Sequence, residues 1–479
     1  MRKGWIVFVT AVLVAVLAVP AMADIKATGF YRSKAWLSNF HDGSGGPSLR
    51  TDQTGDEAQT NAFVEQRARV RFEFGTENVK AIWFLESDML FGDLSGQNGV
   101  RNEGGALGGD SIQIETKNLY LWFKVPDTSL DFSVGLHNGS DDYAGVLWGG
   151  ADFAGITMNG RFEPVKYKLA WLKLYENATH KADDATLYTA AVKFVPTKDL
   201  TLGVNFYFLQ DDTGTGGATT KINPLDDSDA NPANWANAGY KLKLYTPGID
   251  AMFKAGPATI SGFAFYQWGQ FEGYAAGLDD VDVRAYGLDL RADAKLGPAN
   301  AFFEGIYLSG GDSDNKYEAP IGLGDYQGTG TGPGGNSSYT RTRMQIMLAS
   351  WDTINVSQCL VGCSGGEYGD SLGLQGRGLW HVAAGANMDV TPKIKIEGNI
   401  GYAAAVKLQS DEDSWRDKDL GFEVNAGASY NIAKGLDFGL YGAYMWLGGF
   451  VKDAPVAPAT SSPDFKDPWT TYARINYAF

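Results

Sequence analysis

Three arginines at alternate positions form the clearest chemical pattern in this sequence. They belong to a charged set at the same spacing: Glu65, Arg67, Arg69, Arg71 and Glu73. Side chains of a strand alternate between two faces at about 3.3 Å per residue, so neighbouring arginines lie about 6.6 Å apart on one face. An arginine that faces lipid at mid-bilayer costs about 2–4 kcal/mol, so in a membrane strand this face must line water. We predict a pore wall, either as a basic ladder at a constriction or as a wall that ion-pairs with neighbouring strands.

A second charged group lies in the glycine-rich segment 139–153. It comprises Asp141, Asp142 and Asp152. If the segment folds into a pore, its carboxylates oppose the arginines, where charges are less screened than at a surface. The alternative is an ordinary external loop with solvated carboxylates. We predict an acidic loop facing a basic wall, and no metal site, because the aspartates lack the spacing of an EF-hand calcium loop.

Catalytic patterns are missing from the sequence. Its four histidines are not accompanied by a nucleophile elbow, an HExxH zinc motif or a phosphate-binding loop. We therefore predict neither an enzyme nor a cofactor. The two cysteines, Cys359 and Cys363, lie in a Gly/Ser-rich segment, and in an exported protein such a pair closes a disulfide. A metal or redox pair is the less favoured interpretation, because no histidine lies nearby in the sequence.

The N-terminus predicts export. Arg2 and Lys3 precede an apolar run, and Pro20-Ala21-Met22-Ala23 follows it as a cleavage site. The run has about 15 residues, fewer than the about 20 that a spanning helix needs. We predict a cleaved signal peptide over 1–23 and a mature domain over 24–479.

The charge balance restricts the partners. Lys and Arg total 40 against 56 Asp and Glu, a net charge of −16 that becomes −18 once Arg2 and Lys3 are removed with the signal. This acidity argues against nucleic acid as a partner and mildly favours cationic solutes.

Most of the mature sequence alternates apolar and polar residues in segments joined by alternately short and long connections. Segments 61–75 and 79–90, for example, are joined by Thr76-Glu77-Asn78. Short turns on one side and long polar loops on the other are typical of transmembrane barrels. We predict an all-β, antiparallel barrel of 18 strands, with 16 as the alternative, short periplasmic turns and long extracellular loops. A soluble β-sandwich array is less favoured.

The segment 310–378 departs from this pattern. It is too long for a structureless loop, so we predict a long loop insertion. Within it, the piece 341–351 is interpreted as either a strand or a packed helix.

The closing segment alternates apolar residues with Arg474 and Asn476 and ends on Tyr477, Ala478 and Phe479. It resembles the last strand of bacterial outer-membrane barrels, and the resemblance implies that it is the signal read by the barrel assembly machinery.

Further motifs resemble one family more narrowly. Residues 66–71 resemble the Q-R-x-R stretch of Gram-negative trimeric porins, and residues 104–110, 117–126 and 152–156 are similar to the homotrimeric porins of deltaproteobacterial sulfate reducers. The likeness covers 61–163 and the closing strand. It implies a homotrimeric, water-filled channel for passive diffusion, with an inward third loop and trimer contacts through the early strands.

These patterns together predict an outer-membrane porin for ions and small hydrophilic solutes with a weak cation preference. Its expected partners are outer-membrane lipid, lipopolysaccharide, the assembly machinery and two further copies of the chain. One alternative is a substrate-specific channel, for example for sugars, with Trp122, Trp171 and Trp268 as lumen aromatics. The other is a structural or adhesive surface barrel.

Overall fold

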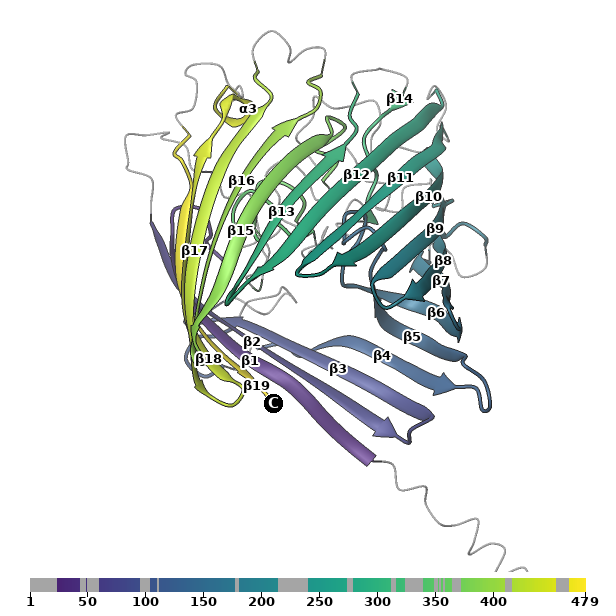
Figure 1. Ribbon diagram of the computed structural model, residues 1–479, viewed down its shortest axis with the longest axis horizontal. Coiled ribbons are helices and arrows are strands. Elements are labelled where there is room, and N and C mark those ends of the chain that lie inside the picture. Colours follow the sequence, from purple (N-terminus) through teal and green to yellow (C-terminus); the bar gives the residue numbers. More distant parts are fainter. Residues whose placement is uncertain are drawn as a thin grey trace, which may run out of the picture.

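The computed structural model is a closed antiparallel β-barrel (Figure 1). It describes residues 24–43, 49, 60–94, 104–109, 112–176, 181–213, 240–273, 279–311, 316–323, 339–348, 352, 355, 358–363, 372–409, 416–453 and 465–479. The predicted signal peptide, residues 1–23, lies outside this part of the chain. Among the described residues, no helix is long and apolar enough to cross a membrane.

The first half of the barrel consists of β1 (Asp24–Ser38), β2 (Asn61–Gly75), β3 (Val79–Leu90), β4 (Glu115–Lys124), β5 (Asp131–Gly139), β6 (Ala151–Phe162), β7 (Val165–Tyr175), β8 (Ala185–Thr197) and β9 (Leu200–Asp211). The second half consists of β10 (Tyr240–Ala255), β11 (Ala258–Gly273), β12 (Val281–Leu296), β13 (Ala299–Leu308), β15 (Leu379–Thr391), β16 (Ile394–Ala405), β17 (Asp419–Ala433), β18 (Leu436–Leu447) and β19 (Trp469–Ala478). A two-residue strand, β14 (Lys316–Tyr317), runs parallel to β12, and a short helix, α3 (Gly449–Lys452), follows β18.

The sheet closes because β1 pairs with both β2 and β19, which places the purple and yellow ends of the chain side by side (Figure 1). Tyr31 on β1 lies opposite Ala68 on one side and Tyr477 on the other. Of the 19 strands in the sheet, β14 is an addition to a ring of 18. The predicted 18-strand barrel is therefore confirmed.

The outer face of the barrel is apolar. On β12, Leu288 and Leu290 are 48% and 62% exposed, whereas Asp289 between them is 7% exposed and points inward. The same alternation exposes Ile475, Tyr477 and Phe479 on the closing strand. Period-two patterning thus produces a continuous outer surface suited to lipid and a polar inner wall.

Two connections enter the barrel and pack against the inner side of its wall. The inner loop, residues 140–150, joins β5 to β6, and the inner belt, here the described residues 339–348, 352, 355 and 358–363, belongs to the long connection between β13 and β15. Tyr143 of the loop and Met344 of the belt are both 0% exposed and belong to one apolar cluster. In the described part of 341–351, residues 341–348 form turns and one isolated bridge from Leu348 to Val361, so the predicted strand or helix is wrong there.

Candidate pore wall and its inward segments

The arginines of β2 face acids on the neighbouring strand. Arg67 donates to both carboxylate oxygens of Asp88 at 2.7 and 2.5 Å, and Arg69 pairs with Glu86. Arg67 lies opposite Asp88 and Arg69 opposite Glu86 in the β2–β3 register. Arg67 is only 5% exposed, and its Nη2 also donates to the carbonyl of Asn355 at 2.8 Å. This geometry matches the ion-paired wall more closely than a free basic ladder.

The two glutamates of the predicted set have different surroundings. Glu65 is 1% exposed and accepts hydrogen bonds from Trp36 Nε1 at 3.1 Å and from the backbone N–H of Asn355 at 2.8 Å. Glu73 lies near the short-turn end, where it pairs with Arg71 and Lys80 at 3.2 Å each. Glu65 therefore attaches the inner belt, whereas Glu73 remains on the more open wall.

The three predicted aspartates are paired at separate places. Asp141 is 8% exposed, and its carboxylate accepts four backbone N–H bonds at 2.7–2.9 Å, from Tyr143, Gly145, Leu147 and Trp148. Burial raises the pKa of this carboxyl to about 6, against the four N–H groups, which lower it. The Asp141 carboxylate thus stabilises the conformation of the inner loop through these four hydrogen bonds.

Asp142 is the loop residue that contacts the neighbouring strands β7 and β8. Its carboxylate lies 2.9 Å from Lys193 Nζ and 3.6 Å from Lys168 Nζ, and Tyr207 Oη donates to it at 2.9 Å. Asp152 lies on β6 and contacts Lys117 and Asn118 at 2.8 and 2.7 Å. Within the described residues, no hydrogen bond or ion pair joins these aspartates to the β2 arginines.

Residues outside the predicted site also hold the inner belt. Glu423 on β17 accepts the backbone N–H groups of three consecutive residues, 345–347, at 2.7–3.1 Å. Asp352 pairs with Lys34 at 3.1 Å and Arg474 at 3.0 Å, and accepts from Tyr472 Oη at 2.9 Å. Period-two patterning predicts the inward direction of Glu423 and Arg474 but not what they contact, since their partners lie about 80 and 120 residues away in the sequence.

Further anchors lie at both ends of the belt. Tyr339 Oη lies 2.9 Å from an oxygen of Asp289 and 2.8 Å from one of Glu304, and Arg341 pairs with the same two carboxylates. At the other end, Gln358 donates to Asp42 Oδ1 at 2.7 Å. The buried residues Cys359 and Cys363 form a disulfide, and no group of metal-binding side chains occurs in the described part of the chain.

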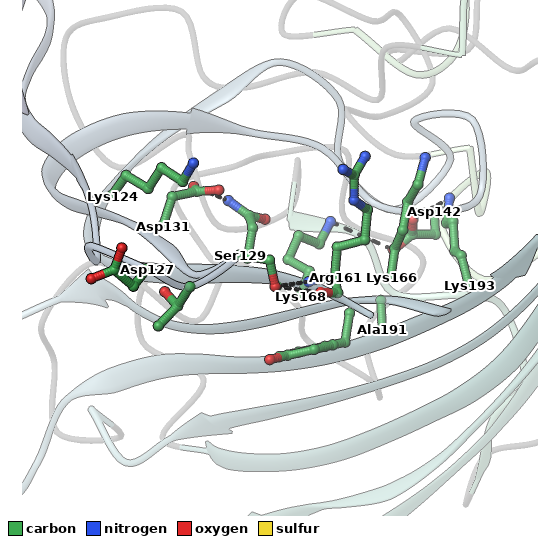
Figure 2. A pocket seen from close by; sticks show the side chains of 14 residues that line it. Lys124, Asp127, Ser129, Asp131, Asp142, Arg161, Lys166, Lys168, Ala191 and Lys193 are labelled. Carbon is green, nitrogen blue, oxygen red and sulfur yellow. Dashed lines mark hydrogen bonds and ion pairs between the residues drawn. The ribbon is translucent and has the colours of Figure 1, made fainter. Parts of the chain in front are cut away.

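A cavity of about 820 Å³ lies against β4–β8 near their short turns. Figure 2 shows Lys166, Lys168 and Lys193 around Asp142, with Lys124, Asp127 and Asp131 at the other end. The lining comprises Lys124, Asp127, Thr128, Ser129, Asp131, Asp142, Asn159, Gly160, Arg161, Lys166, Tyr167, Lys168, Ala191 and Lys193. Its five cations outnumber its three carboxylates, so this part of the wall favours anions.

The three tryptophans proposed to line a sugar path lie on different faces of the barrel wall. Trp171 and Trp268 are 42% and 41% exposed on the apolar outer face, with Leu169 and Tyr266. Trp122 donates to Asp131 at 3.2 Å on the inner face. The three therefore do not form one continuous path through the lumen.

The predicted assembly residues lie at the foot of the closing strand. Tyr477 and Phe479 are 44% and 50% exposed on the outer face, and the backbone of Phe479 exchanges two 3.0 Å hydrogen bonds with Gly29. The C-terminus is thus joined to β1 at the short-turn end.

The fold is similar to that of solved bacterial outer-membrane channels. Alignment to Pseudomonas aeruginosa OccK8 (OprE) gives a TM-score of 0.53 at 12% identity, and alignment to a BenF-like porin of Pseudomonas fluorescens gives 0.52 at 9%. P. aeruginosa OccK2 (OpdF), solved in complex with glucuronate, gives 0.52 at 10%. Each alignment covers 95% of this chain and 98% of the other. No protein-family model and no curated protein sequence matches the chain significantly, so the likeness is one of fold.

Proposed function

We propose that this chain is a bacterial outer-membrane channel for ions and small hydrophilic solutes, with no catalytic role. The observation that carries the proposal is the closed 18-strand barrel, apolar outside and charged inside, with an open charged cavity at its short-turn end. Barrels are one of two ways to cross a bilayer with every backbone polar group paired. Export through a cleaved signal peptide over 1–23 and insertion through the C-terminal Phe479 belong to this proposal.

The finer features follow from charge and from the resemblance of the sequence. The net charge of −16 supports a weak preference for cations. The likeness of residues 61–163 to trimeric porins supports a homotrimer in contact with outer-membrane lipid and lipopolysaccharide.

A second candidate function is a channel selective for small anionic solutes. It is favoured by the five cations of the cavity, and its fold relative OccK2 was solved with glucuronate. Under this candidate, the wall lysines attract the solute carboxylate, and the local charge outweighs the charge of the whole chain.

The deciding experiment is the reversal potential of the purified protein in a planar bilayer under a KCl gradient. Stepwise conductance with a cation-selective sign supports the general channel, and openings in groups of three support the trimer. An anion-selective sign, with block by glucuronate that saturates, supports the second candidate. A folded, heat-modifiable barrel that never conducts contradicts both and favours a structural or adhesive role.

A further inference from the structure

The inner belt covers one half of the barrel wall. Its side-chain and backbone contacts fall on β12 and β13 through Tyr339, on β17 through Glu423, and on β19 and β1 through Asp352. The last wall contact is with β2, where Asn355 donates to Glu65 and Arg67 donates to Asn355. In the order of strands around the barrel, these anchors span nine neighbouring positions of the 18, from β12 to β2.

The inner loop covers the adjoining strands. The ring of Tyr143 lies 5.4 Å from Tyr207 on β9, and 5.5 and 4.9 Å from Phe263 and Phe265 on β11. The loop is also joined to the stretch before the belt, since Leu323 donates its N–H to the carbonyl of Leu147 at 2.8 Å. Belt and loop together therefore contact the inner wall on strands from β9 round to β2.

The wall on β4–β8 lines the cavity, and the inner loop meets it at the ion pairs of Asp142 with Lys168 and Lys193. All cavity residues except Asp142 lie on β4–β8 or their short turns. Lys124 and Lys166 are exposed there, and neither makes an ion pair within the described residues. Arg67, in contrast, is buried between Asp88 and the belt. Of these three cations, the two without an ion pair therefore lie on the wall that lines the cavity.

We propose that solutes pass along the β4–β8 wall, off the axis of the barrel, and that Lys124 and Lys166 set the charge selectivity of this path. Asp142, held by Lys168 and Lys193, marks its narrow end. The inference rests on the proposed channel function and adds which part of the wall performs it. Charges on the belt side contribute less, because the inward segments separate them from the moving solute.

The matched pair Lys166 and Lys395 tests this location. Each is the second residue of its strand, β7 and β16, and each is exposed at the short-turn end. The outward neighbours Ile394 and Ile396 place Lys395 on the inner face, on the belt side of the barrel. At a separation of roughly 7 Å in water with about 0.15 M salt, neutralising one charge beside the path changes the K⁺/Cl⁻ permeability ratio by about twofold, because the screened energies of the two ions shift in opposite directions.

We expect Lys166→Gln to raise the permeability ratio by about twofold and Lys395→Gln to change it much less. As a second readout, Lys166→Cys and Lys395→Cys are treated with one bulky thiol reagent, since both native cysteines are disulfide-bonded. Block at position 166 and not at 395 supports the off-axis path. Equal effects at both positions, or a larger effect at 395, overturn it while leaving the channel function intact. A protein that conducts in no form contradicts the channel function itself.

Discussion

Glu423 provides the most direct test of how the inner belt is attached. Its side chain is fully buried, and its two carboxylate oxygens accept the N–H groups of Gln345, Ile346 and Met347 at 2.7, 3.1 and 2.8 Å. A hydrogen bond to a charged group contributes about 1.5–3 kcal/mol. Glu423→Ala removes all three hydrogen bonds and therefore weakens the attachment of the belt by about 4–9 kcal/mol, before any structural relaxation is counted.

Glu423→Gln is the graded variant. One carboxylate oxygen remains as an acceptor, while the other becomes an amide group that cannot accept from a backbone N–H. The belt then loses one hydrogen bond and the charge assistance of the other two, about 3–5 kcal/mol. The strand ladder of the barrel does not pass through the belt, so we expect the barrel to stay closed while the belt detaches.

The assay is single-channel conductance in a planar bilayer, with heat-modifiable electrophoretic mobility as the check on folding. Conductance should increase from the wild type to Glu423→Gln and again to Glu423→Ala. Glu73→Gln is the matched control, because this β2 carboxylate pairs with Arg71 and Lys80 and not with the belt. Unchanged conductance in folded Glu423 variants would refute the reasoning, and an equal increase in the control would assign the effect to lost charge.

Three further perturbations test the inward segments. Asp141→Ala leaves four backbone N–H groups of the inner loop without their acceptor, so we expect protease to cleave the loop faster than in the wild type. Asp141→Asn should give an intermediate rate, and equal rates in all three proteins would contradict this role of Asp141. Burial acts to raise the pKa of Asp352, but Lys34, Arg474 and Arg32 outweigh it and hold the pKa at about 2. Because this folded-state pKa lies below the usual 3.8, the ionised Asp352 contributes about 2.5 kcal/mol to the attachment of the belt above pH 4, and this contribution is lost as pH falls through about 2. Conductance should then increase reversibly at low pH. Asp352→Asn should show the increased conductance already at pH 7. Replacing Cys359 and Cys363 by serine removes a cross-link that contributes about 2 kcal/mol for so short a loop, and thermal unfolding should show a lower midpoint that matches the reduced wild type.

The barrel could be predicted because its pattern is local. The segments 61–75 and 79–90, expected from alternation and a three-residue turn, are the observed bounds of β2 and β3. The partners of the arginines could have been found in the same way. Arg67 with Asp88 and Arg69 with Glu86 are symmetrical about the turn at 76–78, so the register of that hairpin already pairs them.

The inward segments could not be predicted from periodicity. Residues 341–348 contact the wall through backbone N–H groups that donate hydrogen bonds to Glu423. Because such contacts do not depend on the side chains of the segment, they produce no alternation of apolar and polar residues in its sequence. The contacts of Asp141 could not be predicted from the sequence for a related reason. A carboxylate that binds four N–H groups of its own loop has the same sequence signature as one that faces solvent.

The whole-chain charge and the charge of the open wall disagree in sign. The sum of −16 counts every side chain equally, whereas the cavity lining holds five cations and three carboxylates. What a solute experiences depends on distance, because charges more than one Debye length away are largely screened. Composition alone therefore predicts selectivity only where screening is weak.

This difference makes selectivity depend on salt concentration. At 10 mM salt the Debye length is about 30 Å, so the acidic excess of the whole chain acts on the path, and we expect the cation preference to be strongest. At 1 M salt the length is about 3 Å, and only the side chains beside the path, Lys124 and Lys166 among them, still act. Reversal potentials at a fixed KCl ratio and increasing mean concentration should therefore shift steadily toward chloride. A preference that stays constant across this range would show that charges at one distance, either the near wall or the remote loops, determine selectivity alone.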